Sequence, residues 1–295
     1  MKLTDCTIVW INLDHRKDRR KFMEENLKRL GLKGVRISGV DGQTLRNPEY
    51  VKQIAEEFQV PVSKMDKDYW LSRRNFRTMC RDKNKILGKV GCTLGHLRAL
   101  KYLSGSSEIT YPAIILEDDC VFLWKDRKDM ESDEIGMPPD DCDLFYLGGL
   151  FWHNGNGNTS TPPEKSEIDT INTNWRRIDT DCFKLPCAFS YGFTNSSQLG
   201  HIINLLQCGW NDGPGRLKVS DWKSGNERVI TSIVDLMFVN YVQKNGIAYI
   251  SSPVRAIQSC DFTSDVTDFG EKTPTNPYRH KYFYNKREEV LWNTI

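Results

Sequence analysis

Apolar runs and segments of helical period alternate along the first part of the chain. The β-branched and apolar run TIVWINL at 7–13 predicts a buried strand. KFMEENLKRL at 21–30 then carries apolar residues at helical spacing, and Gly31 gives the helix a place to end. GVRISGVDG at 34–42 continues as a second strand. The order strand, helix, strand favours a parallel α/β unit.

Later segments repeat both patterns. Helices are expected at 47–58, 90–103, 196–207 and 226–246, the last one long, buried and ended by Gly246. Strands are expected at 113–116, 143–149, 185–195 and 247–253.

Two stretches lack a clear period. Residues 61–89 predict a mobile or ligand-closing loop, or alternatively an irregular surface insertion, and the polar segment 153–166 predicts an exposed loop. Neither a repeat nor a linker is visible, so one composite domain is expected over 1–295. Its size permits a large core and therefore an enzyme.

Charge excludes some classes of partner. The 295 residues include 41 Lys and Arg against 39 Asp and Glu, a formal net charge of +2. This balance argues against a nucleic acid or an anionic membrane as the main partner. The basic run DHRKDRR at 14–20 fits a solvated helix face as well as a local anion site.

The cysteines and the apolar runs bear on the compartment. Nine cysteines, an odd number without any CxxC pair, support neither a zinc ribbon nor a disulfide framework. The first residues hold no apolar segment of signal-peptide length, and no run reaches the length of a membrane span. These features predict a cytoplasmic protein in a bacterial or viral setting.

Three consecutive carboxylates follow the apolar run that begins at Ala113. Glu117, Asp118 and Asp119 would repel one another at the end of a buried strand, and a divalent cation is the natural counter-charge. Open α/β sheets also bind ligands at the carboxyl ends of their strands. The alternative is that these acids only form a turn or cap a helix.

The order of six motifs resembles glycosyltransferase family 25, which includes lipopolysaccharide-type and collagen galactosyltransferases. These motifs are INLDHRKDR at 11–19, SGVDG at 38–42, KVGCTLGHLRAL at 89–100, ILEDD at 115–119, CAFSYGFTNSSQLGHIINLL at 187–206 and PVRAIQSCDFTSDV at 253–266. The resemblance spans most of the chain. It implies a GT-A type α/β fold, in which a Rossmann-like mixed sheet flanked by helices binds a nucleotide sugar.

The resemblance also implies that the two halves of the chain have different roles. Residues up to about 150 would form the nucleotide-sugar and metal half, and residues from about 151 to 295 the acceptor half. The donor would be a UDP-sugar, UDP-galactose before UDP-glucose, and the acceptor a hydroxyl of a glycan or protein. The acidic triplet would hold Mn²⁺, or alternatively Mg²⁺, with Asp119 as direct ligand and Asp118 or Glu117 assisting.

Further site residues are carried over by motif. Positions expected to approach the nucleotide and its diphosphate are Asn12, Leu13, Arg16, Arg19, Val40, Asp41 and Gly42, with Gly42 allowing a tight turn. The two arginines fit a solvated helix surface equally well. Gln258 is expected to line the same pocket, and His280 is a weaker candidate metal ligand.

The helix motif departs from the family, because Gly95 stands where a serine usually precedes the histidine. This substitution puts in doubt any hydroxyl contact from that position. His96 is kept, and a structural role is preferred for it because a histidine among leucines is more often structural than catalytic.

An inverting transfer needs a base that takes the proton of the acceptor hydroxyl. Asp235 is the first candidate, because a carboxylate in the apolar helix VITSIVDLMFV would have a raised pKa. A buried cap or salt-bridge partner is the alternative role. Asp265 is the competing base or a second acid on the metal side.

Two other function classes compete with a transferase. A non-catalytic binder of glycans or nucleotide sugars could have kept the fold, and the intact acidic triplet argues against it. A metal-dependent phosphatase or nuclease would need further acids or histidines at metal spacing, and the sequence shows no such cluster.

Overall fold

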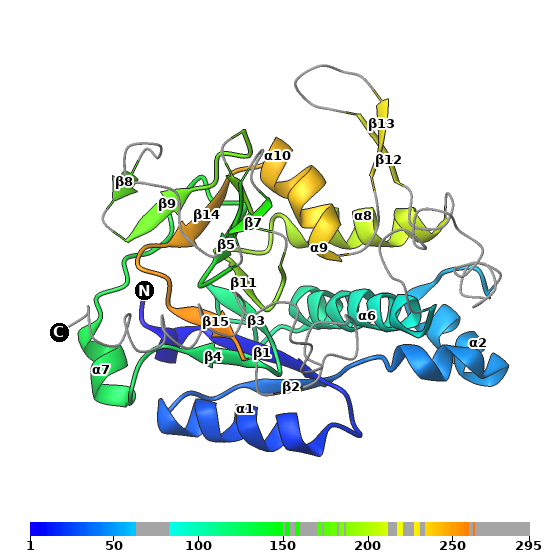
Figure 1. Cartoon of the computed structure of the whole chain (residues 1–295), viewed down its shortest axis with the longest axis horizontal. Coiled ribbons are helices and arrows are strands. Elements are labelled where there is room, and N and C mark those ends of the chain that lie inside the picture. Colours follow the sequence, from blue (N-terminus) through cyan, green and yellow to red (C-terminus); the bar gives the residue numbers. More distant parts are fainter. Residues whose placement is uncertain are drawn as a thin grey trace.

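The computed structural model describes residues 1–62, 83–149, 151–153, 157–159, 170–172, 174–181, 183–185, 187–211, 217–220, 227–230, 234–259 and 262. Its main sheet contains β1 (Thr7–Asn12), β2 (Val35–Ser38), β3 (Ala113–Glu117), β5 (Leu144–Tyr146), β8 (Thr170–Asn172), β9 (Trp175–Arg177), β11 (Ser190–Phe193) and β14 (Ala248–Ser251). The strand order is β2-β1-β3-β11-β5-β14-β9-β8 (Figure 1).

The other elements surround this sheet. The helices are α1 (Lys17–Arg29), α2 (Pro48–Phe58), α6 (Lys83–Gly105), α7 (Arg127–Ser132), α8 (Leu199–Asn211), α9 (Val234–Met237) and α10 (Gln243–Asn245), with 3₁₀-helices η1 (Leu3–Asp5) and η2 (Gly42–Arg46) and a π-helix, η4 (Phe238–Val242). The smaller sheets are formed by β4 (Cys120–Phe122) with β15 (Ala256–Gln258), β6 (Phe151–His153) with β7 (Gly157–Thr159) and β10 (Phe183–Lys184), and β12 (Leu217–Ser220) with β13 (Glu227–Ile230).

The main sheet is mixed. Strands β1, β2 and β3 are parallel to one another, whereas β11 runs antiparallel to both β3 and β5. Helices α1 and α6 lie on opposite sides of β1 and β2 (Figure 1). This arrangement confirms the predicted α/β architecture and fits a GT-A type fold. Strands from both sides of residue 150 share the one sheet, while the division of roles between the two halves stays a prediction.

The N-terminal predictions are confirmed in type and order, with bounds that differ by up to four residues. β1 is buried mainly by β-branched and apolar side chains, and α1 ends before Gly31, whose φ of 64° lies in the left-handed region. Helix α2 starts with Pro48 in its first turn and is capped by the side chain of Asn47.

Three predictions of secondary structure are wrong in part. The expected helix at 226–246 starts at Val234, because Glu227–Ile230 forms β13 and pairs with β12. The expected loop at 61–89 overlaps α6 from Lys83 onward, and its residues 63–82 lie outside the described part. The expected loop at 153–166 contains β7, which pairs with β6. In the first and third cases, antiparallel pairing with a neighbouring strand overrides the local pattern.

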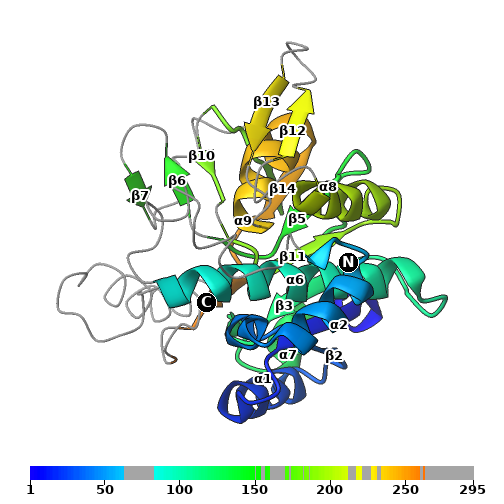
Figure 2. The ribbon, with the colours of Figure 1, turned by 90° about the vertical axis from the view of Figure 1, so that its right-hand side faces the viewer.

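The β12–β13 hairpin projects from the body of the molecule (Figure 2). Strand β12 contacts α8 near its base. Pairing with β12 accounts for the strand at 227–230. An antiparallel partner satisfies the backbone groups that a helix would pair internally.

Position 42 needs glycine because two backbones approach each other closely there, not because its φ is positive. A Cβ atom there would lie 1.9 Å from the carbonyl oxygen of Leu87, and one at Gly91 would lie 2.3 Å from that of Val40. Gly31 is the one described glycine with a positive φ, so backbone conformation does not require glycine at position 42. The turn after β2 and helix α6 therefore touch backbone to backbone.

Gly42→Ala is expected to lower the free energy of unfolding by roughly 1–3 kcal/mol or more, because the added methyl group forces these two backbones apart. Urea denaturation measures the change. Gly105→Ala is the control, since a Cβ atom at Gly105 would meet nothing within 4 Å. Equal stabilities of the two variants would contradict the close contact.

Candidate active site

The register of two parallel strands places polar side chains together. Ile11 of β1 lies opposite Glu117 of β3, so Asn12 and Asp118 leave the same edge of the sheet side by side. Asn12 Nδ2 donates a hydrogen bond of 2.7 Å to Asp118 Oδ2. Asn12 Oδ1 accepts one of 3.0 Å from Arg36, which fixes the orientation of the amide.

Arg19 reaches the same edge from α1. Its Nη1 atom lies 2.9 Å from Asp118 Oδ1 and 3.1 Å from Asp119 Oδ2, and its side chain is only 10% exposed. The guanidinium therefore points inward and pairs with two acids of the triplet. The interpretation of Arg19 as a solvated helix surface is wrong, because α1 packs against β4 and turns this residue toward the sheet.

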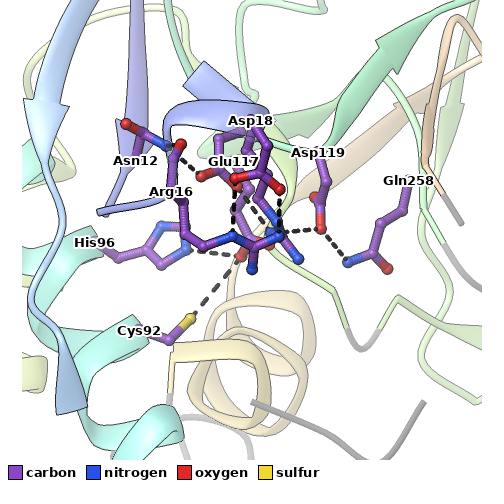
Figure 3. A network of polar contacts seen from close by, with 10 residues as sticks. Asn12, Arg16, Asp18, Cys92, His96, Glu117, Asp119 and Gln258 are labelled. Carbon is purple, nitrogen blue, oxygen red and sulfur yellow. Dashed lines mark hydrogen bonds and ion pairs between the residues drawn. The ribbon is translucent and has the colours of Figure 1, made fainter. Parts of the chain in front are cut away.

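Gln258 is brought in by a two-stranded sheet. β15 pairs with β4 so that Gln258 lies opposite Cys120, the residue after Asp119. Gln258 Nε2 donates a hydrogen bond of 3.2 Å to Asp119 Oδ2 (Figure 3). The backbone N–H of Ser259 also donates to the carbonyl oxygen of Asp119, at 2.7 Å. These contacts hold Asp119 from the side opposite Asn12.

Glu117 faces helix α6. His96 Nε2 lies 3.0 Å from Glu117 Oε1, and Cys92 Sγ lies 3.9 Å from the same oxygen (Figure 3). His96 Nδ1 lies 3.0 Å from the hydroxyl oxygen of Tyr191 in β11. Cys92 and His96 are one helical turn apart, so both side chains point from one face of α6 toward β3.

The site carries more negative than positive charge. Burial, followed by the charge of Asp118, raises the pKa of Glu117, and burial, followed by the charge of Glu117, raises the pKa of Asp119. Within this cluster the three carboxylates face one guanidinium, that of Arg19. Full ionisation therefore leaves an uncompensated charge of about −2, which a divalent cation would balance.

A cation also fits an unused ligand atom. Asp119 is 5% exposed, and its buried Oδ1 atom has no hydrogen-bond partner among the described residues. A buried carboxylate oxygen without a partner is costly, and it is a ligand that Mn²⁺ and Mg²⁺ prefer. Asp119 thus fits a hard divalent ion through a free oxygen. Both oxygens of Asp118 already accept hydrogen bonds, from Asn12 and Arg19, and Oε1 of Glu117 is engaged by His96.

Asp235 lies close to this cluster, at the start of α9. Burial, with the charge of Glu117 as the next cause, raises its pKa from 3.8 to about 7. Its Oδ1 atom is buried and has no hydrogen-bond partner among the described residues. No cap or salt bridge within the described part accounts for this carboxyl.

Asp235→Asn is expected to raise the free energy of unfolding at pH 8 by on the order of 1–3 kcal/mol, after allowance for partial exposure. Between about pH 4 and pH 7 the folded protein keeps the Asp235 proton and the unfolded chain loses it, so stability falls as the pH rises. Urea denaturation at pH 4 and pH 8 tests this, since the two proteins should be nearly equal at pH 4. A less stable variant at pH 8 would mark Asp235 as a structural carboxylate.

The remaining predicted residues lie around the cluster. Arg16 pairs with Asp18 at 2.9 Å, and its backbone carbonyl accepts a hydrogen bond from Asn12. Val40 is 2% exposed and belongs to the core, so its side chain does not contact a ligand.

The turns that follow β1 and β2 lie at the same edge of the sheet. Gly39 N–H donates to the carbonyl oxygen of Asn12 at 2.8 Å, which places the turn after β2 beside half-buried Leu13. Asp41 caps η2 through Gln43 N–H. Asp265 and His280 lie outside the described residues and stay predictions.

The sequence alone missed the group around Glu117. Cys92, His96 and Glu117 bring ligand atoms within 4.8 Å of one another, although no metal-like cluster was expected. The spacing of Cys92 and His96 was a usable signal, because residues four apart share a helix face. The preferred structural role of His96 agrees with its burial and with a bond at each ring nitrogen.

Comparison with known proteins relates the first part of the chain to a family. Residues 6–135 match the model of glycosyltransferase family 25, described as an LPS biosynthesis protein. Over this stretch the chain is similar to glycosyltransferase family 25. The matched part includes β1, α1, α6 and the acidic end of β3. No curated protein matches the chain.

The match to family 25 indicates sugar transfer, with a sugar donor and an acceptor as partners. The matched stretch supplies every residue of the acid cluster except Gln258. Among the helices that the structure describes, none is both long enough and apolar enough to cross a membrane.

Proposed function

We propose that this protein is an inverting glycosyltransferase that moves a hexose, galactose first, from a UDP-sugar to a hydroxyl of a glycan or protein. The observation that carries the proposal is the buried acidic end of β3, where Asp119 keeps one unpartnered carboxylate oxygen. The match of residues 6–135 to family 25 supports the reaction class. Galactose and uridine rest on the family resemblance.

The donor diphosphate would lie at the carboxyl edge of β1 and β3, where open α/β sheets bind nucleotides. Asp119 and Asp118 would hold Mn²⁺, or Mg²⁺, which neutralises negative charge on the leaving diphosphate. Arg19 and Gln258 keep the Asp119 carboxylate in one orientation. Asn12 does the same for Asp118.

Asp235 would act as the base. The acceptor oxygen bonds to the anomeric carbon, the bond to the diphosphate breaks, and the hydroxyl proton passes to the Asp235 carboxylate. A pKa of about 7 suits this task, because the group is partly ionised at neutral pH and still basic enough to take a proton. Its unpartnered Oδ1 supports the same role. Asp265 stays the competing candidate.

A non-catalytic binder of glycans or nucleotide sugars is the second candidate. One contact favours it: Arg19 already pairs with both Asp118 and Asp119, as a cation would in a site that has lost its metal. Gly95, in place of the usual serine, points the same way. The unbalanced charge of the acidic cluster favours the enzyme.

Incubation with single UDP-sugars, Mn²⁺ and a mixed panel of glycan and peptide acceptors tests the proposal. We expect a hexose mass increase on an acceptor with UDP-galactose, and none with chelator. Thermal shift should show greater stabilisation by UDP with Mn²⁺ than by ADP or GDP with Mn²⁺. Binding of the donor without any transfer would favour the second candidate, and equal shifts would count against a uridine site.

A further inference from the structure

The side chains that meet around Glu117 form a group separate from the Asp118–Asp119 pair. Cys92 and His96 project from α6 and Glu117 from the end of β3, so the three come from two elements that pack together (Figure 3). Glu117 is 24% exposed on its side chain and His96 only 1%. The group is therefore anchored deep in the fold and open at one carboxylate.

The distances match those of a four-coordinate ion. Tetrahedral zinc, with bonds of about 2.3 Å to sulfur and 2.0–2.2 Å to nitrogen and oxygen, holds its ligand atoms about 3.4–3.6 Å apart. Here His96 Nε2 and Glu117 Oε1 are 3.0 Å apart, and Cys92 Sγ and Glu117 Oε1 are 3.9 Å apart. A shift of about 0.5 Å would bring each of these two pairs to tetrahedral spacing, and Cys92 Sγ lies within 4.8 Å of a ring nitrogen of His96.

A second observation points to a ligand at this place. Asp235 has a buried Oδ1 atom without a hydrogen-bond partner among the described residues. Burial lowers the pKa of His96 to about 4 and raises the pKa of Cys92, and the charge of Asp235 acts to raise both. Asp235 therefore lies near the group, although its oxygens are not among the ligand atoms that gather within 4.8 Å of one another.

The outer contact of His96 is also typical of a metal ligand. Histidines that bind metal through one ring nitrogen almost always place the other in a hydrogen bond. Nδ1 of His96 is 3.0 Å from the buried hydroxyl of Tyr191, which would fix the tautomer that leaves Nε2 free for the ion.

We propose that Cys92, His96 and Glu117 form a second metal site that binds Zn²⁺ and leaves the fourth position of the ion for water. A thiolate and an imidazole prefer zinc to the hard ions Mn²⁺ and Mg²⁺, which Asp118 and Asp119 suit better. Binding displaces the thiol proton of Cys92 and the proton that His96 shares with Glu117, so affinity rises with pH.

Occupation of this site has a consequence for catalysis that rests on the proposed function. A divalent cation held by Glu117 and His96 would oppose proton uptake by nearby Asp235, the proposed base, so Zn²⁺ should inhibit sugar transfer even when Mn²⁺ saturates the acidic pair. The binding of Zn²⁺ itself does not depend on what the protein catalyses. A failed transfer assay would therefore leave the metal site to be judged on binding alone.

Co²⁺ is the probe for binding, because a thiolate ligand gives it a charge-transfer absorption band. Titration of the metal-free full chain should produce this band at one Co²⁺ per chain, and added Zn²⁺ should remove it. Cys92→Ser should abolish the band. The controls Cys6→Ser, which changes a cysteine outside the group, and Asp119→Asn, which alters only the acidic pair, should keep it.

Absence of the band in the wild-type chain, or its survival in Cys92→Ser, would overturn the proposal. Circular dichroism and a melting curve establish that the Cys92→Ser chain is folded. If it is not, X-ray absorption of the Zn²⁺-loaded wild-type chain decides without any substitution. One sulfur at about 2.3 Å from zinc is expected, and a shell of nitrogen and oxygen alone would rule the site out.

Discussion

Asp119→Asn is expected to lower the rate of sugar transfer by about 10²-fold or more, because electrostatic stabilisation of the leaving diphosphate is lost. The amide keeps the shape of the carboxylate but is a poor ligand for Mn²⁺. The fold should survive, since Arg19 retains its ion pair with Asp118. Product mass measures the rate, and electron paramagnetic resonance of free Mn²⁺ measures metal binding.

Glu24→Gln is a matched control for this change. It also replaces a carboxylate by an amide, but Glu24 is 52% exposed on α1 and pairs only with Arg20 among the described residues. The control should keep both the transfer rate and the Mn²⁺ affinity. Full activity of Asp119→Asn in the presence of chelator would eliminate the proposed metal role.

Asp235→Asn is expected to reduce kcat by about 10²-fold or more while the affinity for UDP is unchanged, as for the loss of a positioned base. The structural reason is the buried carboxyl with a pKa of about 7 and no described partner for Oδ1. Turnover under donor and acceptor saturation measures kcat, and calorimetric titration with UDP and Mn²⁺ measures binding.

Stability separates a base from a structural residue at this position. If Asp235 is a base whose burial lowers the stability of the fold, Asp235→Asn is more stable than the wild type at pH 8 and nearly inactive. A structural Asp235 gives a variant that is less stable and loses both rate and donor affinity. Asp265→Asn is the comparison, because loss of turnover there with an active Asp235→Asn would transfer the role of base to Asp265.

The acid triplet illustrates how the sequence can locate a site without revealing the hydrogen bonds and ion pairs inside it. An apolar run followed by three carboxylates predicted a ligand edge at the end of β3, and the register of β1 against β3 puts Asn12 beside it. Which acid keeps a free oxygen depends on Arg19 and Gln258, which approach from α1 and β15. These contacts span 100 and 139 residues, so no local pattern encodes them.

The sequence by itself determined the first strand, the helix ended by Gly31, and α2 with Pro48 near its start. It also determined the family resemblance and the acidic edge. Only the tertiary structure decided that Glu227–Ile230 is a strand and that Gly42 serves a backbone contact. It alone turned Cys92 and His96 toward Glu117. The physical reason is that periodicity records which face of an element is buried, whereas the residue it meets depends on how distant segments pack.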